Sequence, residues 1–271
     1  MEDIRTRYKS VLTIAGSDSG GCAGIQADIK SISACGAYAA TVITATTAQN
    51  TQGVSDIHPI PVSHIEKQLD TVFSDITFDA VKIGMLHSCE VIKAVSSKLM
   101  AYNAKNIVID PVMVATSGDN LITEQAIICL RELLPKASII TPNTQEAEIL
   151  IGHSINNNNA AITSKEIGEL YGTSVLLKGG HLASSTDEML DVLYDSSTKK
   201  TTLIKNPRIA TNNTHGTGCS LSSSIATFLS KGYDLETATK KACSYINNAI
   251  EKGKNKALGK GNGPINHFGL V

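Results

Sequence analysis

The chain has 271 residues, a formal net charge of -1, and 42% hydrophobic against 18% charged residues. This composition is typical of a globular protein that buries a sizeable core, as one large α/β domain or two small ones. With only 4% aromatic residues, no tryptophan and no basic excess, the chain lacks the charge footprint and the stacking surfaces of a nucleic-acid-binding protein.

Short apolar or β-branched runs alternate with amphipathic segments along the chain. The runs predict strands at 10–15, 39–48, 80–83, 106–109, 138–140 and 174–178. The amphipathic segments predict helices at 25–35, 62–73, 90–102, 123–134, 144–151, 164–171, 216–231 and 235–252. Two further runs predict an antiparallel pair at 188–195 and 199–205. This alternation is the pattern of a mostly parallel sheet covered on both faces, so we expect an α/β fold formed as a single domain over 1–271.

The six cysteines are scattered along the chain and form no C-x-x-C pair. They are Cys22, Cys35, Cys89, Cys129, Cys219 and Cys243. The first ten residues lack an apolar signal core, and no run is long enough to span a membrane. We therefore expect a cytoplasmic protein without membrane contact and with free thiols, all of which except Cys219 serve packing.

The stretch 211–224, TNNTHGTGCSLSSS, has the composition of an anion-binding turn. Two glycines and several small hydroxyl residues stand directly before the apolar run 221–229, which predicts a helix. A glycine-rich turn that opens a helix leaves backbone N–H groups without partners at the positive end of the helix dipole. The stretch therefore predicts a phosphate-binding site.

A second glycine-rich turn, GSDSGGCAG, follows the first predicted strand. Gly16 and Gly21 have the spacing of a phosphate-loop pair, but Cys-Ala stands where Lys-Ser or Lys-Thr would have to follow, which argues against a P-loop nucleoside triphosphatase. A Rossmann fingerprint is also missing, which disfavours a Rossmann-type oxidoreductase. The turn is compatible with simple chain reversal, while the flanking Asp18 and Asp28 favour a polar small-molecule pocket.

Polar side chains stand where three other predicted strands end, which is the edge where parallel sheets bind ligands. Asp110 could cap its strand or position a metal ion. Asn143 and Glu146 begin a helix, where the carboxylate either favours the helix dipole or helps to hold Mg²⁺ through oxygen and water ligands. Lys178 ends a buried strand, and its ammonium group needs an anionic partner.

An ordered set of motifs is specific when taken together. It comprises AGSDSGGCAGIQADIK, VITATTAQNTQGV, KIGML, DPVMVATSGD, TPNTQEA, LLKGGH, NTHGTGCS and GNGPINHF. In this order, the set resembles the hydroxymethylpyrimidine/phosphomethylpyrimidine kinases of thiamine biosynthesis, which belong to the ribokinase-like superfamily. The resemblance implies a three-layer α/β/α fold, a homodimer, and MgATP as phosphoryl donor. It also implies phosphorylation of 4-amino-5-hydroxymethyl-2-methylpyrimidine (hydroxymethylpyrimidine below) to its monophosphate and then to the diphosphate.

The resemblance also implies roles for individual residues. The amide of Gln49 would read the edge of the pyrimidine. The same pocket would be lined by Gly16, Ala23, Asp28, Met85 and Val112. The ATP phosphates and the metal would be served by Lys178, Asn143, Thr217, Glu146 and Asp110. The catalytic residues would be Gly216, Gly218 and Cys219, which form an anion hole for the transferred phosphate, and Lys178, which adds a fixed positive charge.

Cys219 stands where much of the superfamily has an aspartate general base. Its simplest interpretation is a small buried side chain at a helix start. A thiol at a helix N-terminus can instead have its pKa lowered below about 8.5 and act as a base. A neutral thiol would also suit the second step, because the monophosphate acceptor is already anionic at pH 7 and a fixed aspartate would repel it.

Two rival functions stay open. The first is a pyridoxal or pyridoxine kinase of the same superfamily, because its pyridine substrate also carries a hydroxymethyl group; Gln49 and Met85 favour the pyrimidine. The second is a non-catalytic sensor of hydroxymethylpyrimidine or nucleotide. A sensor does not need transfer machinery, so the anion-hole glycines with Lys178 and Glu146 favour a kinase.

Overall fold

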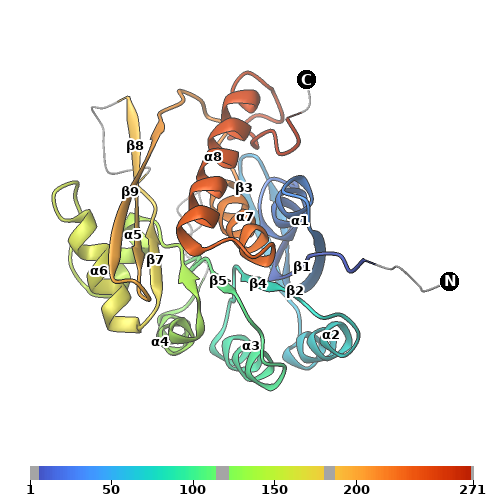
Figure 1. Ribbon diagram of the computed structural model, residues 1–271. Coiled ribbons are helices and arrows are strands. Elements are labelled where there is room, and N and C mark those ends of the chain that lie inside the picture. Colours follow the sequence, from blue (N-terminus) through green and yellow to red (C-terminus); the bar gives the residue numbers. More distant parts are fainter. Residues whose placement is uncertain (1–5, 114–121, 180–186, 270–271) are drawn as a thin grey trace.

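The computed structural model describes residues 6–113, 122–179 and 187–269, and within these ranges the strands form one nine-stranded sheet (Figure 1). The strands are β1 (Ser10–Asp18), β2 (Tyr38–Asn50), β3 (Gly53–Pro59), β4 (Ala80–Ile83), β5 (Ile107–Ile109), β6 (Ile139–Ile140), β7 (Ser174–Leu177), β8 (Glu188–Asp195) and β9 (Lys200–Pro207). Their order across the sheet is β3-β2-β1-β4-β5-β6-β7-β8-β9.

The central strands, from β2 to β7 in that order, run parallel, and antiparallel strands complete both edges. Each central strand alternates between the two faces of the sheet: in β5, Ile107 and Ile109 enter one apolar core and Val108 enters the other. Because these strands are parallel, their carboxyl ends meet at one edge of the sheet. That edge receives the polar residues that follow the strands in the sequence.

Helices cover both faces of the sheet (Figure 1). One face carries α1 (Gly24–Ala34), α7 (Thr217–Ser230) and α8 (Leu235–Gly253). The other carries α2 (Val62–Asp75), α3 (Cys89–Ala101), α4 (Glu124–Leu133) with the short 3-10 helix η1 (Leu134–Lys136), α5 (Thr144–Ile151) and α6 (Ala160–Tyr171). The predicted three-layer α/β/α fold with a mostly parallel sheet is confirmed. None of the described helices is both long and apolar enough to cross a membrane.

The differences from the predicted elements lie mainly at the surface. Strand β4 and helix α5 have the predicted bounds, whereas α6 begins at Ala160 rather than at 164. Strand β3 was not predicted. It pairs with β2 at the edge of the sheet and buries none of its residues fully, so it has no apolar alternation that the sequence could show.

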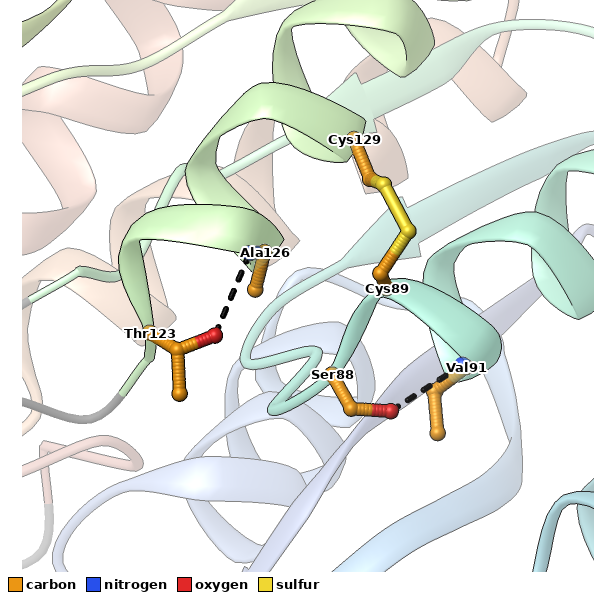
Figure 2. Close-up of a disulfide and its surroundings, with 6 residues drawn as sticks. All are labelled: Ser88, Cys89, Val91, Thr123, Ala126 and Cys129. Carbon is orange, nitrogen blue, oxygen red and sulfur yellow. Dashed lines mark hydrogen bonds between the residues drawn. A yellow bond between two sulfur atoms is a disulfide. The ribbon is translucent and has the colours of Figure 1, made fainter.

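Figure 2 shows a disulfide that the sequence did not predict. It joins Cys89, the first residue of α3, to Cys129 in α4, with 5.4 Å between their Cα atoms. The side chains of Ser88 and Thr123 cap the starts of these two neighbouring helices. The expectation of free thiols is therefore wrong for this pair. The two cysteines are 40 positions apart in the sequence, and only the packing of α3 against α4 brings them together, so the sequence shows no sign of the bond. The free cysteines are Cys22, Cys35, Cys219 and Cys243.

Candidate active site

A pocket opens at the carboxyl edge of the sheet, beside the first turns of α1 and α7. The predicted site residues in its lining are Gly16, Ala23, Gln49, Met85, Asp110, Val112, Asn143, Glu146, Lys178, Gly216, Gly218 and Cys219. The further lining residues are Ala15, Ser17, Asp18, Gly24, Thr47, Val54, Lys82 and His215. Of the predicted residues, Asp28 and Thr217 lie outside this lining. Thr217 begins α7, and its hydroxyl donates to the carbonyl of Thr214 at 2.9 Å.

The start of α7 packs closely against the turn that precedes α1. Gly216, the N-cap of α7, has a left-handed backbone with a φ of 83°. A Cβ at this position would lie 1.8 Å from the carbonyl oxygen of Cys22, so only glycine fits. The first turn of α7 then lines the pocket through Gly218 and Cys219. Since the first N–H groups of a helix have no partner inside it, this turn has the geometry of an anion-binding site.

Cys219 lies where two helix N-termini meet. Its sulfur accepts a hydrogen bond from the N–H of Gly24, the first residue of α1. Burial nevertheless raises the pKa of Cys219 to about 11, while the nearby Lys82 acts in the opposite direction. Of the alternatives that the sequence left open, the structure favours the neutral thiol over a base with a lowered pKa, because desolvation of the thiolate outweighs the favourable helix ends. The half-buried thiol is neutral at pH 7.

Lys178, which directly follows β7, supplies a cation. Its Nζ donates to Oδ1 of Asp110 at 2.8 Å and lies 3.9 Å from Oε2 of Glu146. Burial alone would lower the pKa of Lys178, but these two carboxylates outweigh it and the pKa is raised. Burial would likewise raise the pKa of Asp110, but Lys178 reverses the direction and lowers it. A Cβ at Gly218 would lie 3.4 Å from this Nζ, so the charged ammonium lies beside the start of α7.

Asn143 and Glu146 form a capping box at the start of α5. Oδ1 of Asn143 accepts from the N–H of Glu146 at 2.9 Å, and Oε2 of Glu146 accepts from the N–H of Asn143 at 2.8 Å. Burial raises the pKa of Glu146 to about 7. The capping bonds occupy oxygens of both side chains, so these residues fit a metal ion that keeps its own waters better than a direct ligand cage. The described ranges contain no cluster of three or more His, Cys, Asp or Glu residues suited to a metal.

Asp28 does not line the pocket, contrary to the expectation from the resemblance. Its carboxylate is fully buried and accepts hydrogen bonds from Thr13, Ser223 and Lys82. Lys82 links this carboxylate to the pocket wall. Burial alone would lower the pKa of Lys82, but Asp28 outweighs it and the pKa is raised. Lys82 was not predicted as a site residue, although a lysine inside the apolar strand β4 gives the same signal as Lys178.

The turn between β1 and α1 is held by Asp18. The carboxylate of Asp18 accepts hydrogen bonds from the backbone N–H groups of Gly20, Cys22 and Ala23, at 2.7 to 2.8 Å. Those N–H groups are therefore not free to cradle a phosphate, which agrees with the missing P-loop motif. Asp18, expected from the sequence beside a polar pocket, lines the pocket and also holds the backbone of this turn.

A further part of the wall is suited to a ring with polar edges. Met85 follows β4 and lies against Gly16, where a Cβ would come within 2.8 Å of the Met85 Cε. Gln49 lies near the end of β2, next to an irregularity in its pairing with β3. Its Nε2 lies 3.0 Å from Nε2 of His215. His215 was not singled out from the sequence, although it stands beside the first glycine of NTHGTGCS.

Comparison with known proteins finds relatives along nearly the whole chain. Residues 18–266 match the family model described as phosphomethylpyrimidine kinase. A hydroxymethylpyrimidine/phosphomethylpyrimidine kinase of Rhizobium meliloti is 45% identical over 262 residues, which cover 95% of this chain and 96% of that protein. The thiamine biosynthesis bifunctional protein ThiED of Geobacter sulfurreducens is 47% identical over 261 residues, covering 96% of this chain and 52% of that protein. The chain thus spans about half the length of several curated relatives that it matches.

Solved structures share the fold. Phosphomethylpyrimidine kinase from Clostridium difficile superposes with a TM-score of 0.78 at 41% identity, over 89% of this chain and 99% of that one. Pyridoxal kinase from Bacillus subtilis, solved as an ADP complex, gives a TM-score of 0.87 at 33% identity, over 96% of this chain and 98% of that one. Since the family model matches most of the chain and the Rhizobium relative matches it along its length, the chain belongs to the phosphomethylpyrimidine kinase family, which has the ribokinase-like fold.

Proposed function

We propose that this protein transfers a phosphoryl group from MgATP to hydroxymethylpyrimidine, and then a second one to the monophosphate, giving the diphosphate for thiamine biosynthesis. The observation that carries the proposal is a single pocket that holds the amide of Gln49 together with the cation of Lys178 and the first turn of α7. Phosphoryl transfer depends on positioning and charge stabilisation rather than on covalent chemistry from the protein, so this set of groups is sufficient.

The phosphate end of the pocket would act through fixed positive charge. Lys178 is charged, is oriented by Asp110, and lies beside the N-terminal turn of α7. Ammonium and helix N–H groups in this arrangement would stabilise the charge on the transferred phosphoryl group. Glu146 and Asn143 would hold Mg²⁺ through water, and the ion would neutralise charge on the ATP phosphates.

The acceptor end of the pocket would hold the pyrimidine ring. Gln49 would bind the polar edge of the ring, with apolar contacts from Met85 and Val112. Gly16 and Ala23 would form a wall of small residues, and a Cβ at Gly16 would lie 2.8 Å from the Cε of Met85. Ring and phosphate sites share one pocket, so the hydroxymethyl group of a bound acceptor would reach the anion hole without a change of site.

The raised pKa of Cys219 favours a part in the anion hole over the role of general base. A thiol that is neutral at pH 7 adds no negative charge to the site. That property suits the second step, in which the acceptor is a phosphate that an aspartate would repel. We propose that the cysteine is what allows one site to accept both the alcohol and its monophosphate.

The test is ADP formation from ATP with three acceptors offered separately: hydroxymethylpyrimidine, its monophosphate and pyridoxal. The proposal expects turnover with the first two. Absence of turnover with both would contradict it, and turnover with pyridoxal alone would establish the rival function.

Pyridoxal kinase activity, alone or in addition, is the second candidate. The observation that favours it is the close structural likeness to the Bacillus subtilis pyridoxal kinase. The sequence is nevertheless more similar to the Rhizobium meliloti hydroxymethylpyrimidine/phosphomethylpyrimidine kinase, at 45% against 33% identity. The pyrimidine kinase is therefore the first proposal.

We also propose that the chain acts as a single-domain homodimer in the cytoplasm, where the Cys89–Cys129 pair would be kept reduced. The continuous sheet, which runs through every described strand, supports the single domain. The family resemblance supports the homodimer. Light scattering in solution would test the assembly, with a mass twice that of one chain expected and the mass of one chain contradicting it.

A further inference from the structure

The amide of Gln49 lies between two polar side chains. Its Oε1 is 3.1 Å from the hydroxyl of Thr47, and its Nε2 is 3.0 Å from Nε2 of His215. An amide has a donor end and an acceptor end, and rotating it by half a turn exchanges them. The neighbour that accepts only one orientation therefore decides which end the amide offers to a ligand.

Thr47 does not decide the orientation. Its hydroxyl also lies 3.0 Å from the backbone carbonyl of Ser17. A hydroxyl donates one hydrogen and accepts through its lone pairs. Thr47 can donate to Gln49 Oε1, or it can donate to Ser17 and accept from a reversed amide. Both orientations of Gln49 therefore leave Thr47 satisfied.

His215 does decide the orientation. Burial lowers the pKa of the ring and keeps it neutral with a single N–H, which the backbone carbonyl of Asn262 favours. Nε2 faces the amide nitrogen of Gln49, which can only donate, so Nε2 is the acceptor of the neutral ring and the hydrogen lies on Nδ1. A reversed amide would place Oε1 against the lone pair of Nε2, which is repulsive. The tautomer of His215 and the orientation of the Gln49 amide thus determine each other.

The surroundings hold the imidazole in this state. His215 is 7% exposed, and burial lowers its pKa although the carboxylate of Asp18 acts in the opposite direction. Its backbone N–H donates to the carbonyl of Gly263 at 3.1 Å, and it forms a β-bridge with Pro264. The chain continues directly into Gly216, whose close contact with the turn before α1 permits little movement. The ring is therefore a rigid acceptor at neutral pH.

With the amide so fixed, Gln49 keeps one N–H and one oxygen lone pair for a ligand. A ring nitrogen acceptor next to an amino donor is complementary to this pair. We propose that His215 is a positioning residue that fixes the Gln49 amide, and that this kinase thereby selects acceptors with an aminopyrimidine edge over acceptors whose edge has the reversed donor and acceptor order. The inference rests on the proposed function only in taking the pyrimidine as the acceptor.

The test compares hydroxymethylpyrimidine with its oxo analogue, in which a carbonyl replaces the amino group and the neighbouring ring nitrogen carries hydrogen. Binding of each compound is measured by calorimetry, and KM and kcat by ADP release. The variants are His215→Phe, which keeps a ring but removes the acceptor, and His215→Gln, which can return an oxygen acceptor. Thr47→Val is the matched control, because it removes the neighbour that satisfies both amide orientations.

The wild-type protein is expected to bind the amino compound about tenfold or more tightly, the value of one good hydrogen bond to a buried group. His215→Phe should raise KM for the amino compound, change kcat less, and bring the preference close to equality. His215→Gln should restore much of the preference, and Thr47→Val should keep it. If the histidine were purely structural, its replacement would lower the affinity for both compounds equally and leave the preference unchanged.

Two results would overturn the inference: a His215→Phe protein that keeps the wild-type preference, or a wild-type protein that prefers the oxo compound or binds neither. Failure of the proposed function gives a different result. In that case the amino compound binds with the expected preference, but no ADP is released with either the alcohol or its monophosphate.

Discussion

The Nζ atom of Lys178 lies 2.8 Å from the Oδ1 atom of Asp110. Lys178 directly follows β7 and Asp110 directly follows β5, and the two residues meet because parallel strands end at the same edge of the sheet. Asp110 is 2% exposed, so solvent screens this pair little. An ammonium group has more than one N–H donor, so the bond to Asp110 orients the lysine while leaving donors for a phosphate ligand.

Replacing Lys178 with methionine should remove the fixed cation while keeping a side chain of similar length. We expect kcat to fall by about two to three orders of magnitude, as when one preorganised stabilising group is lost. Steady-state ADP release measures the effect. Lys205→Met is the control, because Lys205 is an exposed lysine on β9, and its kcat should equal that of the wild type. Equal kcat for Lys178→Met would show that Lys178 does not act in the transfer.

Replacing Lys82 with methionine should destabilise the fold. The change leaves the carboxylate of Asp28 buried without its cation, which typically costs about 3–5 kcal/mol. The free energy of unfolding in urea measures the loss. The double variant Lys82→Met with Asp28→Asn should recover part of it, because the neutral amide still pairs with Thr13 and Ser223. Equal stability of the two variants would mean that the isolated charge is not the cause.

Replacing Cys219 with aspartate should slow the second phosphorylation more than the first. A fixed carboxylate would repel the anionic monophosphate, and every 1.4 kcal/mol of repulsion costs about a factor of ten in rate. The kcat/KM values for the alcohol and for the monophosphate are measured separately. Cys219→Ser is the control, since a neutral hydroxyl should affect both steps alike. If the aspartate slows both steps equally, the neutral thiol has no special role in the second.

The thiol of Cys219 should react slowly with iodoacetamide at neutral pH. The thiolate is the reacting form, and the pKa is raised to about 11, so the thiolate fraction grows with pH and never saturates below that value. The alkylation rate should rise about tenfold for each pH unit between roughly pH 7 and 10. Mass spectrometry of the labelled peptide assigns the rate to Cys219. A rate that levels off near neutral pH would instead mean a thiol activated by the helix ends.

Much of the fold and part of the site follow from local patterns. Alternating apolar runs and amphipathic segments were sufficient to predict a parallel sheet with helices on both faces. A parallel sheet in turn predicts that residues following different strands converge, as Asp110, Asn143 and Lys178 do. Strand β3 escaped prediction because an edge strand is stabilised by pairing with its neighbour rather than by an apolar face of its own.

The remaining features depend on contacts between distant segments. The ion pair between Lys82 and Asp28 joins residues 54 positions apart, and the contact between Gln49 and His215 joins residues 166 positions apart. Composition and periodicity carry no information about such pairs. The raised pKa of Cys219 was unpredictable for a related reason: the sequence shows the helix start that favours a thiolate, but the burial that outweighs it exists only in the packed fold.

The most direct test of the account follows the products of one reaction over time. Purified protein is incubated with hydroxymethylpyrimidine and excess MgATP, and phosphorus NMR or anion-exchange chromatography separates the products. We predict that the monophosphate appears first and is then converted to the diphosphate, with one ATP consumed at each step. A reaction that stops at the monophosphate, or that forms no phosphorylated pyrimidine, would contradict the central claim that one site performs both transfers.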